Sequence, residues 1–200
     1  MPRFKLRIAG PAGRIETVID DPGASRKGLA FIAHPHPLHG GSFENKVVKT
    51  IATALLDLGY VAVRPNFRGV GASSGEYDGG RGEVEDMLAV HDFVRPRYPE
   101  LPVILAGFSF GAYVQSVVAE RVSPQHVLLV GPAVNLFQMG RAAPGTIVIH
   151  GEQDELVPAE AARQWAQSHG ATFALVPGAD HFFHRKLSAL REHIEALCPC

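Results

Sequence analysis

The chain has 200 residues, of which 46% are hydrophobic and 20% are charged, and its formal net charge is −1. This size and apolar content allow one well-buried core and predict a single domain over residues 1–200. The composition excludes disorder, collagen-like repeats and coiled coil, because each needs a strong bias that is absent. A charge near zero predicts neither nucleic acid nor an anionic membrane as partner.

Three segments bear on where the protein works. Residues 1–20 alternate apolar and charged side chains, so we expect no signal peptide there. The uncharged stretch Leu101–Ala119 is long enough for a membrane span, but its glycines and polar residues favour a buried strand followed by a core helix. Cys198 and Cys200 lie at the end of the chain and predict an exposed tail rather than a disulfide framework. Together these features predict a cytoplasmic protein.

Short apolar runs alternate with helical patterns along the chain. An opening hairpin with a Gly/Pro turn is predicted over Phe4–Ala9 and Arg14–Ile19. Six further strands are predicted at Leu29–Ala33, Tyr60–Val63, Val103–Phe108, Val127–Val130, Thr146–His150 and Phe173–Val176. Helices are predicted at Lys46–Leu58, Glu83–Val94, Phe110–Arg121, from Pro158 to about His169, and along Leu187–Leu197. The alternation predicts an α/β fold: a mostly parallel eight-stranded sheet with helices on both faces and an antiparallel N-terminal hairpin.

The strongest chemical feature is Gly107-Phe108-Ser109-Phe110-Gly111, which stands between an apolar strand and a helix. A serine on such a tight strand-to-helix turn projects outward at the carboxyl edge of the sheet. A Cβ at either glycine would collide with the neighbouring strand or helix. The start of the helix also offers backbone N–H groups and the positive end of its dipole. The pattern predicts Ser109 as a nucleophile, with a plain turn serine as the alternative.

A serine hydroxyl needs a general base at neutral pH, and that base needs an orienting carboxylate. Of the histidines after Ser109, only His181 lies in a polar turn after the last strand, and it is the predicted base. His184 is its competitor. His150 ends an apolar strand and is expected to be a hydrogen-bonded strand-end histidine.

The loop after the seventh strand carries the predicted acid, because such a sheet presents functional groups at the carboxyl ends of its strands. Asp154 in this loop is short and rigid, which suits it to fixing a histidine tautomer. Glu152 and Glu155 are interpreted as solvated loop charges. Asp180 directly precedes His181, and adjacent side chains seldom face each other, so we expect Asp180 to cap the last helix.

Three stretches together resemble the α/β-hydrolase superfamily. They are Gly-Phe-Ser-Phe-Gly at 107–111, His-Gly-Glu-Gln-Asp-Glu-Leu-Val-Pro at 150–158 and Ala-Asp-His-Phe-Phe at 179–183. The resemblance extends from about Gly28 to Ile194. Within the superfamily the chain is similar to small lidless serine hydrolases related to dienelactone hydrolases and bacterial carboxylesterases.

The resemblance implies Ser109 as nucleophile, His181 as general base and Asp154 as its orienter. Dienelactone hydrolases use cysteine as nucleophile, whereas this chain has serine. The segment Gly131–Gly145 is too short for the helical lid that many lipases place there. Its length predicts an open cleft and a small or soluble substrate, or one whose bulk projects outward.

The segment 33–41 follows the third strand, and in the superfamily this loop supplies one backbone donor of the oxyanion hole. The residue after the nucleophile, Phe110, supplies the other. The two prolines of the segment have no N–H, which leaves His36 and Leu38 as candidates. Alignment with the family's His-Gly-x pattern favours His36.

Three histidines in the same segment, His34, His36 and His39, also permit a metal site. A metal site needs further ligands at suitable spacing, and the sequence nominates no convincing fourth one. We therefore expect neither a metal nor a cofactor.

The segment Asn66–Gly75 partly mimics a dinucleotide fingerprint, but no helix is predicted to begin at Gly71. It resembles a superfamily loop that is mostly structural beside the active site. Substrate contact through Arg68 or Tyr77 is the alternative.

Phe67, Leu136 and Phe182, together with Phe110, are candidates for the acyl side of the substrate pocket, or equally for the core. The sequence thus predicts a serine hydrolase that cleaves small carboxylic esters or thioesters through an acyl-enzyme on Ser109, as a monomer or homodimer. The alternatives are an acyltransferase or peptidase with the same triad, or a non-catalytic binding module.

Overall fold

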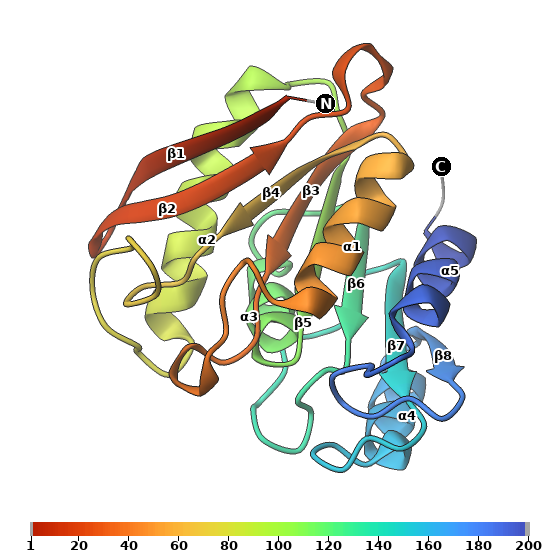
Figure 1. The fold of residues 1–200 in the computed structure, drawn as a ribbon. Coiled ribbons are helices and arrows are strands. Elements are labelled where there is room, and N and C mark those ends of the chain that lie inside the picture. Colours follow the sequence, from red (N-terminus) through yellow and green to blue (C-terminus); the bar gives the residue numbers. More distant parts are fainter. Residues whose placement is uncertain (1, 199–200) are drawn as a thin grey trace.

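In the computed structural model, residues 2–198 are described and form an eight-stranded sheet with helices on both faces, as the sequence predicts (Figure 1). The strands are β1 (Arg3–Gly10), β2 (Gly13–Asp20), β3 (Gly28–Ala33), β4 (Tyr60–Pro65), β5 (Val103–Phe108), β6 (His126–Val130), β7 (Thr146–Gly151) and β8 (Thr172–Val176). The helices are α1 (Lys46–Asp57), α2 (Arg81–Val94), α3 (Phe110–Val118), α4 (Ala159–Ser168) and α5 (Leu187–Leu197).

The strand order β1-β2-β4-β3-β5-β6-β7-β8 places β3 between β4 and β5. β1 and β2 form the predicted antiparallel hairpin, with Arg3 opposite Asp20 and Gly10 opposite Gly13, and β2 is also antiparallel to β4. The pairings from β4 through β8 are parallel. The chain passes from β3 to β4 and then crosses to the other side of β3. In open α/β sheets such a reversal of strand order leaves a crevice at the carboxyl ends of the strands.

Each face of the sheet carries its own apolar core. On one face α1 and α5 lie side by side and bury residues such as Leu55 and Ile194 (Figure 1). On the other face α2, α3 and α4 bury residues such as Met87, Val114 and Ala166. Because helices cover both faces, polar groups can gather at the ends of the strands, and that is where the site lies.

Helix α2 begins two residues before the predicted start, for a reason that lies in its first turn. The Glu83 carboxylate accepts hydrogen bonds from the backbone N–H groups of Asp78 (3.0 Å) and Gly80 (2.8 Å). This capping interaction satisfies donors that the start of a helix otherwise leaves unpaired. The helix therefore extends back to Arg81.

The C-terminal end of the chain differs from its prediction. Cys198 is only 3% exposed and packs in the core between α1, α5 and the sheet, so the expectation of an exposed tail is wrong for this residue. The apolar face of α5 directs the residue that follows it inward. Cys200 lies outside the described residues.

Two expectations about long apolar or helical elements can be compared with the structure. Within residues 2–198, no helix combines the length and apolar character needed to cross a bilayer. The segment 131–145 between β6 and β7 contains no helix, so the predicted absence of a helical lid is confirmed.

Candidate active site

Ser109 lies at the turn between β5 and α3, in a backbone conformation that serine rarely adopts. Its φ is 55° and its ψ is −116°. A Cβ on Gly107 would come within 2.3 Å of the Gly111 carbonyl oxygen, and one on Gly111 within 2.3 Å of the Ala33 carbonyl oxygen. The first contact is with α3 and the second with β3, so the two glycines are required for the predicted reason. The strained turn places the serine at the carboxyl edge of the sheet.

His181 and Asp154 come together from the turns after β8 and β7. The His181 Nδ1–H donates to Asp154 Oδ2 across 2.6 Å. The other oxygen of Asp154 accepts the backbone N–H groups of Leu156 (2.9 Å) and Val157 (2.8 Å). Burial alone would raise the pKa of Asp154, but the hydrogen bonds from His181 and Val157 hold it below the ordinary range of an aspartate.

The other ring nitrogen of the same histidine faces the serine. His181 Nε2 lies 3.0 Å from Ser109 Oγ. Because Nδ1 carries the proton that Asp154 accepts, Nε2 is the acceptor and the serine hydroxyl donates to it. The three predicted residues thus form a continuous hydrogen-bonded chain, in an order suited to removing the hydroxyl proton during nucleophilic attack.

The loop after β3 distinguishes the two candidate oxyanion donors. The Leu38 N–H donates to the Nδ1 of His36 (3.2 Å), so it is already engaged. Within residues 2–198, neither His36 N–H nor Phe110 N–H has a protein acceptor. The His36 carbonyl accepts from His39 and Gly41 (both 3.1 Å), which fixes this peptide segment. The hydrogen bonding favours His36 over Leu38, as the sequence alignment does.

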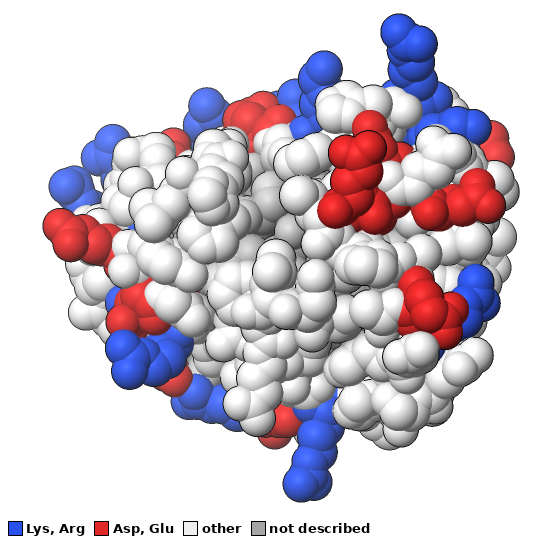
Figure 2. All heavy atoms as spheres, turned by 90° about the horizontal axis from the view of Figure 1, so that it is seen from below, with Lys and Arg blue, Asp and Glu red and all other residues white. Residues whose placement is uncertain are grey.

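A cleft of about 530 Å³ opens over Ser109. It is lined by Pro35, His36, His39, Gly41, Asn45, Ser109, Phe110, Ala133, Leu136, Phe137, Leu156, His181 and Phe182. Its volume lies in the range of small-molecule sites. Figure 2 views the carboxyl ends of the strands and shows uncharged residues over the middle of this face, with charged side chains mainly around it.

Comparisons with known proteins agree with this geometry. The model of the hydrolase family described as serine aminopeptidase, S33, matches residues 36–145. The chain belongs to this α/β-hydrolase family. It is 40% identical to an α/β serine hydrolase homologue from Coxiella burnetii, covering 100% of this chain and 99% of that one with a TM-score of 0.94. It is 36% identical to a serine hydrolase of Xanthomonas campestris described as having no lid, covering 98% of this chain and 94% of that one with a TM-score of 0.92. An uncharacterised protein of Rickettsia prowazekii is 36% identical in an alignment of 197 positions that covers 91% of this chain and 83% of that protein.

This α/β hydrolase has a further buried histidine beside Asp154. The ring of His150 is fully buried, and its Nε2–H donates to the Val157 carbonyl (2.9 Å) while lying 3.3 Å from Asp154 Oδ2. Burial lowers the pKa of His150, which favours the neutral ring. The expected hydrogen-bonded strand-end histidine is found, but its proximity to Asp154 was not predicted. The four-residue spacing between the end of β7 and the loop that follows it was the available signal.

His184, the competing base, points elsewhere. Its Nδ1 bonds to Asp180 Oδ2 (2.7 Å), and its backbone N–H donates to Asp180 Oδ1 (3.0 Å). Asp180 therefore caps the turn that precedes α5. The prediction that it caps α5 itself is wrong, because that helix begins only at Leu187, after Lys186.

The three histidines of the loop after β3 have separate roles in the structure. His34 is buried, with Nδ1–H donating to the Pro35 carbonyl (2.7 Å) and Nε2 accepting the Phe67 N–H (2.9 Å). Burial lowers the pKa of His34 to about 4. The rings of His36 and His39 lie 4.6 Å apart at the cleft. Over the described part of the chain, no cluster of three or more His, Cys, Asp or Glu is arranged to hold a metal ion.

Not all of the predicted pocket residues line the cleft. Leu136 and Phe182 line the cleft, as does Phe110. Phe67 is only 1% exposed and packs behind Phe110, with ring centroids 5.6 Å apart. The expectation that Phe67 contacts substrate is therefore corrected: it supports Phe110 and His34 from the core. Arg68 is likewise structural, because its guanidinium forms a two-bond ion pair with Asp86.

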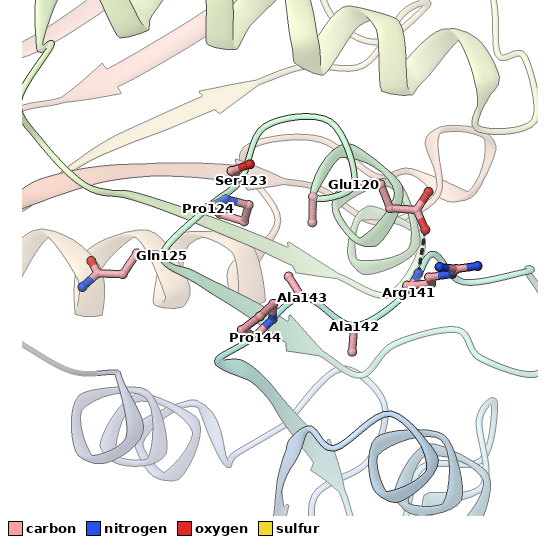
Figure 3. A pocket seen from close by; sticks show the side chains of 9 residues that line it. Glu120, Ser123, Pro124, Gln125, Arg141, Ala142, Ala143 and Pro144 are labelled. Atoms are coloured by element: carbon pink, nitrogen blue, oxygen red, sulfur yellow. Dashed lines mark hydrogen bonds between the residues drawn. The ribbon is translucent and has the colours of Figure 1, made fainter.

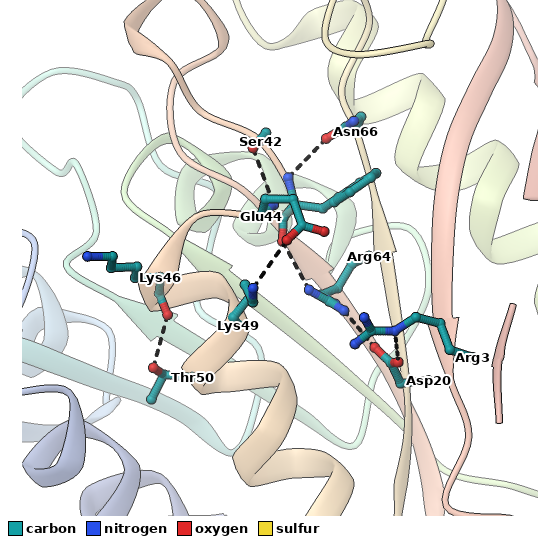
Figure 4. A network of polar contacts seen from close by, with 10 residues as sticks. Arg3, Asp20, Ser42, Glu44, Lys46, Lys49, Thr50, Arg64 and Asn66 are labelled. Atoms are coloured by element: carbon teal, nitrogen blue, oxygen red, sulfur yellow. Dashed lines mark hydrogen bonds and ion pairs between the residues drawn. The ribbon is translucent and has the colours of Figure 1, made fainter. Parts of the chain in front are cut away.

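A buried arginine that sequence reasoning missed holds the far end of the loop after β3. Arg64 on β4 donates to the Phe43 carbonyl (3.0 Å) and to Asp20 Oδ2 (2.6 Å), while Asn66 Oδ1 accepts the Phe43 N–H (2.9 Å). Figure 4 shows Arg64 and Asn66 meeting this segment, with Asp20 on the other side of Arg64 and Arg3 beyond Asp20. Both backbone groups of Phe43 are thus fixed. An arginine within a strand gives no sequence signal for this contact, because its partners lie 21 and 44 residues away.

The protein has a larger surface depression, of about 800 Å³, at the opposite end of the sheet (Figure 3). It is lined by small and polar residues from the segments around the end of α3 and the start of β6 and β7. The Glu120 carboxylate accepts a hydrogen bond there from the backbone N–H of Arg141 (2.8 Å). Ser109 is at the other end of α3, so volume alone does not locate the chemistry.

Proposed function

We propose that the protein is a serine hydrolase that cleaves carboxylic esters or thioesters of small acyl substrates. The observation that carries this proposal is the hydrogen-bonded chain from Ser109 Oγ through His181 to Asp154, in a cleft whose described lining includes no Lys, Arg, Asp or Glu. Membership of the α/β serine hydrolases supports hydrolysis in general. The ester specificity is our inference from the cleft.

The proposed reaction has two halves. Ser109 Oγ attacks the acyl carbonyl while His181 Nε2 takes its proton, and His181 returns that proton to the departing alcohol or thiol. Water then attacks the acyl-enzyme with the same histidine as base, the bond between the acyl carbon and Ser109 Oγ breaks, and His181 returns the proton to Ser109 Oγ as the acid leaves. The Phe110 and His36 N–H groups hold the oxyanion in both halves, and each contributes about 3 kcal/mol to lowering the barrier.

Cleavage of an amino-terminal peptide bond is the activity that the family description names, and the cleft gives it less support. An aminopeptidase must hold the substrate's ammonium group, and a carboxylate is the usual partner for a cation removed from water. The described residues that line the cleft include no Asp or Glu. An uncharged acyl group fits this lining better.

A substrate panel tests the proposal. We expect turnover of p-nitrophenyl butyrate and of a butyryl thioester of an uncharged thiol, and none of leucine p-nitroanilide. Ser109→Ala should abolish both activities. Adding hydroxylamine as a competing nucleophile separates hydrolysis from acyl transfer. Cleavage of the anilide alone would replace the proposal with a peptidase, and no turnover by folded protein would favour a binding module.

A further inference from the structure

The large apolar side chains that are exposed on this protein are not scattered. Within residues 2–198 they are Phe4 (48% exposed), Leu38 (68%), Leu136 (63%), Leu156 (54%) and Phe182 (44%). Leu136, Leu156 and Phe182 line the cleft over Ser109, and Leu38 lies in the loop that borders it. Phe4 alone is remote, on the edge strand β1. Clustered apolar exposure marks a binding surface, whereas single exposed residues need no explanation.

Leu136, Leu156 and Phe182 come from three different loops. These loops follow β6, β7 and β8, which are neighbours in the sheet, so they converge on one side of the cleft. We call these three residues the apolar rim. Residues so far apart in the chain form one surface only because the parallel strands end at the same edge.

The apolar rim is held on a fixed backbone. The Leu156 N–H donates to Asp154 Oδ1 (2.9 Å), and its carbonyl accepts from the Asn135 side chain (3.2 Å). The Leu136 N–H donates to the Ala133 carbonyl (3.0 Å). These bonds join the loop after β6 to the loop after β7, so two of the rim residues keep a constant spacing beside the reacting groups.

Phe182 connects the rim directly to the reactive histidine. Its ring meets that of His181 edge-on, with centroids 5.1 Å apart, and rests on Phe108 at 6.0 Å. A chain that passes from Ser109 toward solvent on this side therefore meets Phe182 before it leaves the cleft. Covering these side chains removes apolar surface from water, which is favourable in proportion to the area covered.

Resting on the function proposed above, we propose that the substrate is an uncharged ester with an extended apolar chain, and that the apolar rim binds this chain. The cleft offers no Lys, Arg, Asp or Glu among the described residues that line it, so a charged chain would lose hydration without gaining a partner. A short acyl or alkyl group leaves the rim uncovered. A longer one covers it and gains binding energy for each methylene that leaves water.

The test is a chain-length series of p-nitrophenyl esters from acetate to octanoate, together with alkyl acetates followed by titration of released acid. We expect kcat/KM of the wild type to rise about fourfold for each methylene the rim covers. A rise in the first series places the acyl chain on the rim. A rise in the second places the alcohol chain there, and either supports the proposal.

The rim variant is Leu136→Ser with Leu156→Ser and Phe182→Ser, and the matched control is Phe4→Ser. The readout is the ratio of kcat/KM for octanoate to that for acetate, because the ratio cancels any change in the shared catalytic groups. We expect the rim variant to lower this ratio at least about tenfold, by losing several methylene contacts. Phe4→Ser should leave it unchanged.

Two results would overturn the proposal: a flat chain-length dependence in an active wild type, and an unchanged ratio in the rim variant. If that unchanged ratio is accompanied by loss of a dimer on size-exclusion chromatography, the rim is a contact between two copies of the chain. Failure of the proposed function looks different, because the wild type would then cleave no ester of any length.

Discussion

Two Asp–His pairs meet around the turn after β8 through histidines only three residues apart, and a similar geometry stands in opposite surroundings. His181 Nδ1 is 2.6 Å from Asp154 Oδ2, and His184 Nδ1 is 2.7 Å from Asp180 Oδ2. The side chains of the first pair are 6% and 0% exposed, and those of the second pair are 70% and 41% exposed. The two hydrogen bonds are almost equal in length, so the pairs differ in exposure and not in the distance between their atoms.

The surroundings distinguish the pairs. The first is shielded from water and continues to Ser109 at 3.0 Å, whereas the second closes on its own turn. Burial by itself would raise the pKa of Asp180, but the two hydrogen bonds that His184 donates hold it below the ordinary value of an aspartate. Water screens that exposed pair, so it contributes little energy. The two pairs thus differ in burial and in the presence of a third partner, and on these grounds we propose the first as the reactive pair.

The largest expected effect comes from replacing each histidine. We expect His181→Gln to lower kcat by about 10⁴-fold or more, because the serine loses its general base. His184→Gln should change kcat by less than twofold. Ester hydrolysis by the two purified variants, with circular dichroism to verify folding, measures this difference. A comparable loss of kcat in both variants would contradict the assignment of His181, rather than His184, as the general base.

The two aspartates should differ by a smaller but still large factor. We expect Asp154→Asn to lower kcat by about 10³- to 10⁴-fold, since an amide would favour the wrong histidine tautomer. Asp180→Asn should leave kcat near the wild-type value. Steady-state kinetics on both variants checks this. Wild-type activity in folded Asp154→Asn would show that another group orients His181.

The lowered pKa of Asp154 should also appear in the acid stability of the protein. The pKa of Asp154 is lower in the folded protein than in an unfolded chain, where it is near 3.9. Its stabilising effect is thus fully present above that unfolded value and is lost as the pH falls through the lower folded value. The free energy of unfolding, measured with urea from pH 6 downward, should therefore fall less steeply with decreasing pH in Asp154→Asn than in the wild type. The same decrease in the variant as in the wild type would contradict a lowered pKa of Asp154 in the folded protein.

The smallest effect concerns the exposed pair. Asp180→Asn should reduce the free energy of unfolding by less than about 1 kcal/mol, because solvent screens its contact with His184. High salt should reduce even this difference. Urea unfolding at pH 7, at two salt concentrations, measures it. A salt-independent loss of several kcal/mol would show that the turn is stabilised by more than an exposed ion pair.

The sequence predicted the features that depend on local pattern. The strand Val103–Phe108 and the glycines beside Ser109 follow from residues that are adjacent in the chain, and both match the structure. The meeting of Ser109, His181 and Asp154 could be predicted because parallel strands present their carboxyl ends at one edge. The inference used the proximity of strand ends at one edge of the sheet, because the three residues are far apart in the chain.

The features that sequence reasoning missed depend on packing between distant segments. Nothing local distinguishes Phe67, which is buried, from Phe182, which lines the cleft. The same holds for Arg64, whose carbonyl partner on Phe43 comes from another loop, and for Cys198, which α5 turns into the core. Such positions are set by tertiary contacts that a periodic pattern does not record.

The central claim is that Ser109 is activated by His181 and the buried Asp154. The most direct measurement is the rate at which a fluorophosphonate probe labels the protein, with the adduct mapped by mass spectrometry. We predict a single adduct on Ser109, rapid in wild type and in Asp180→Asn, strongly slowed in Asp154→Asn and absent in Ser109→Ala. Failure of folded wild type to react, or equal labelling rates in the two aspartate variants, would contradict the account.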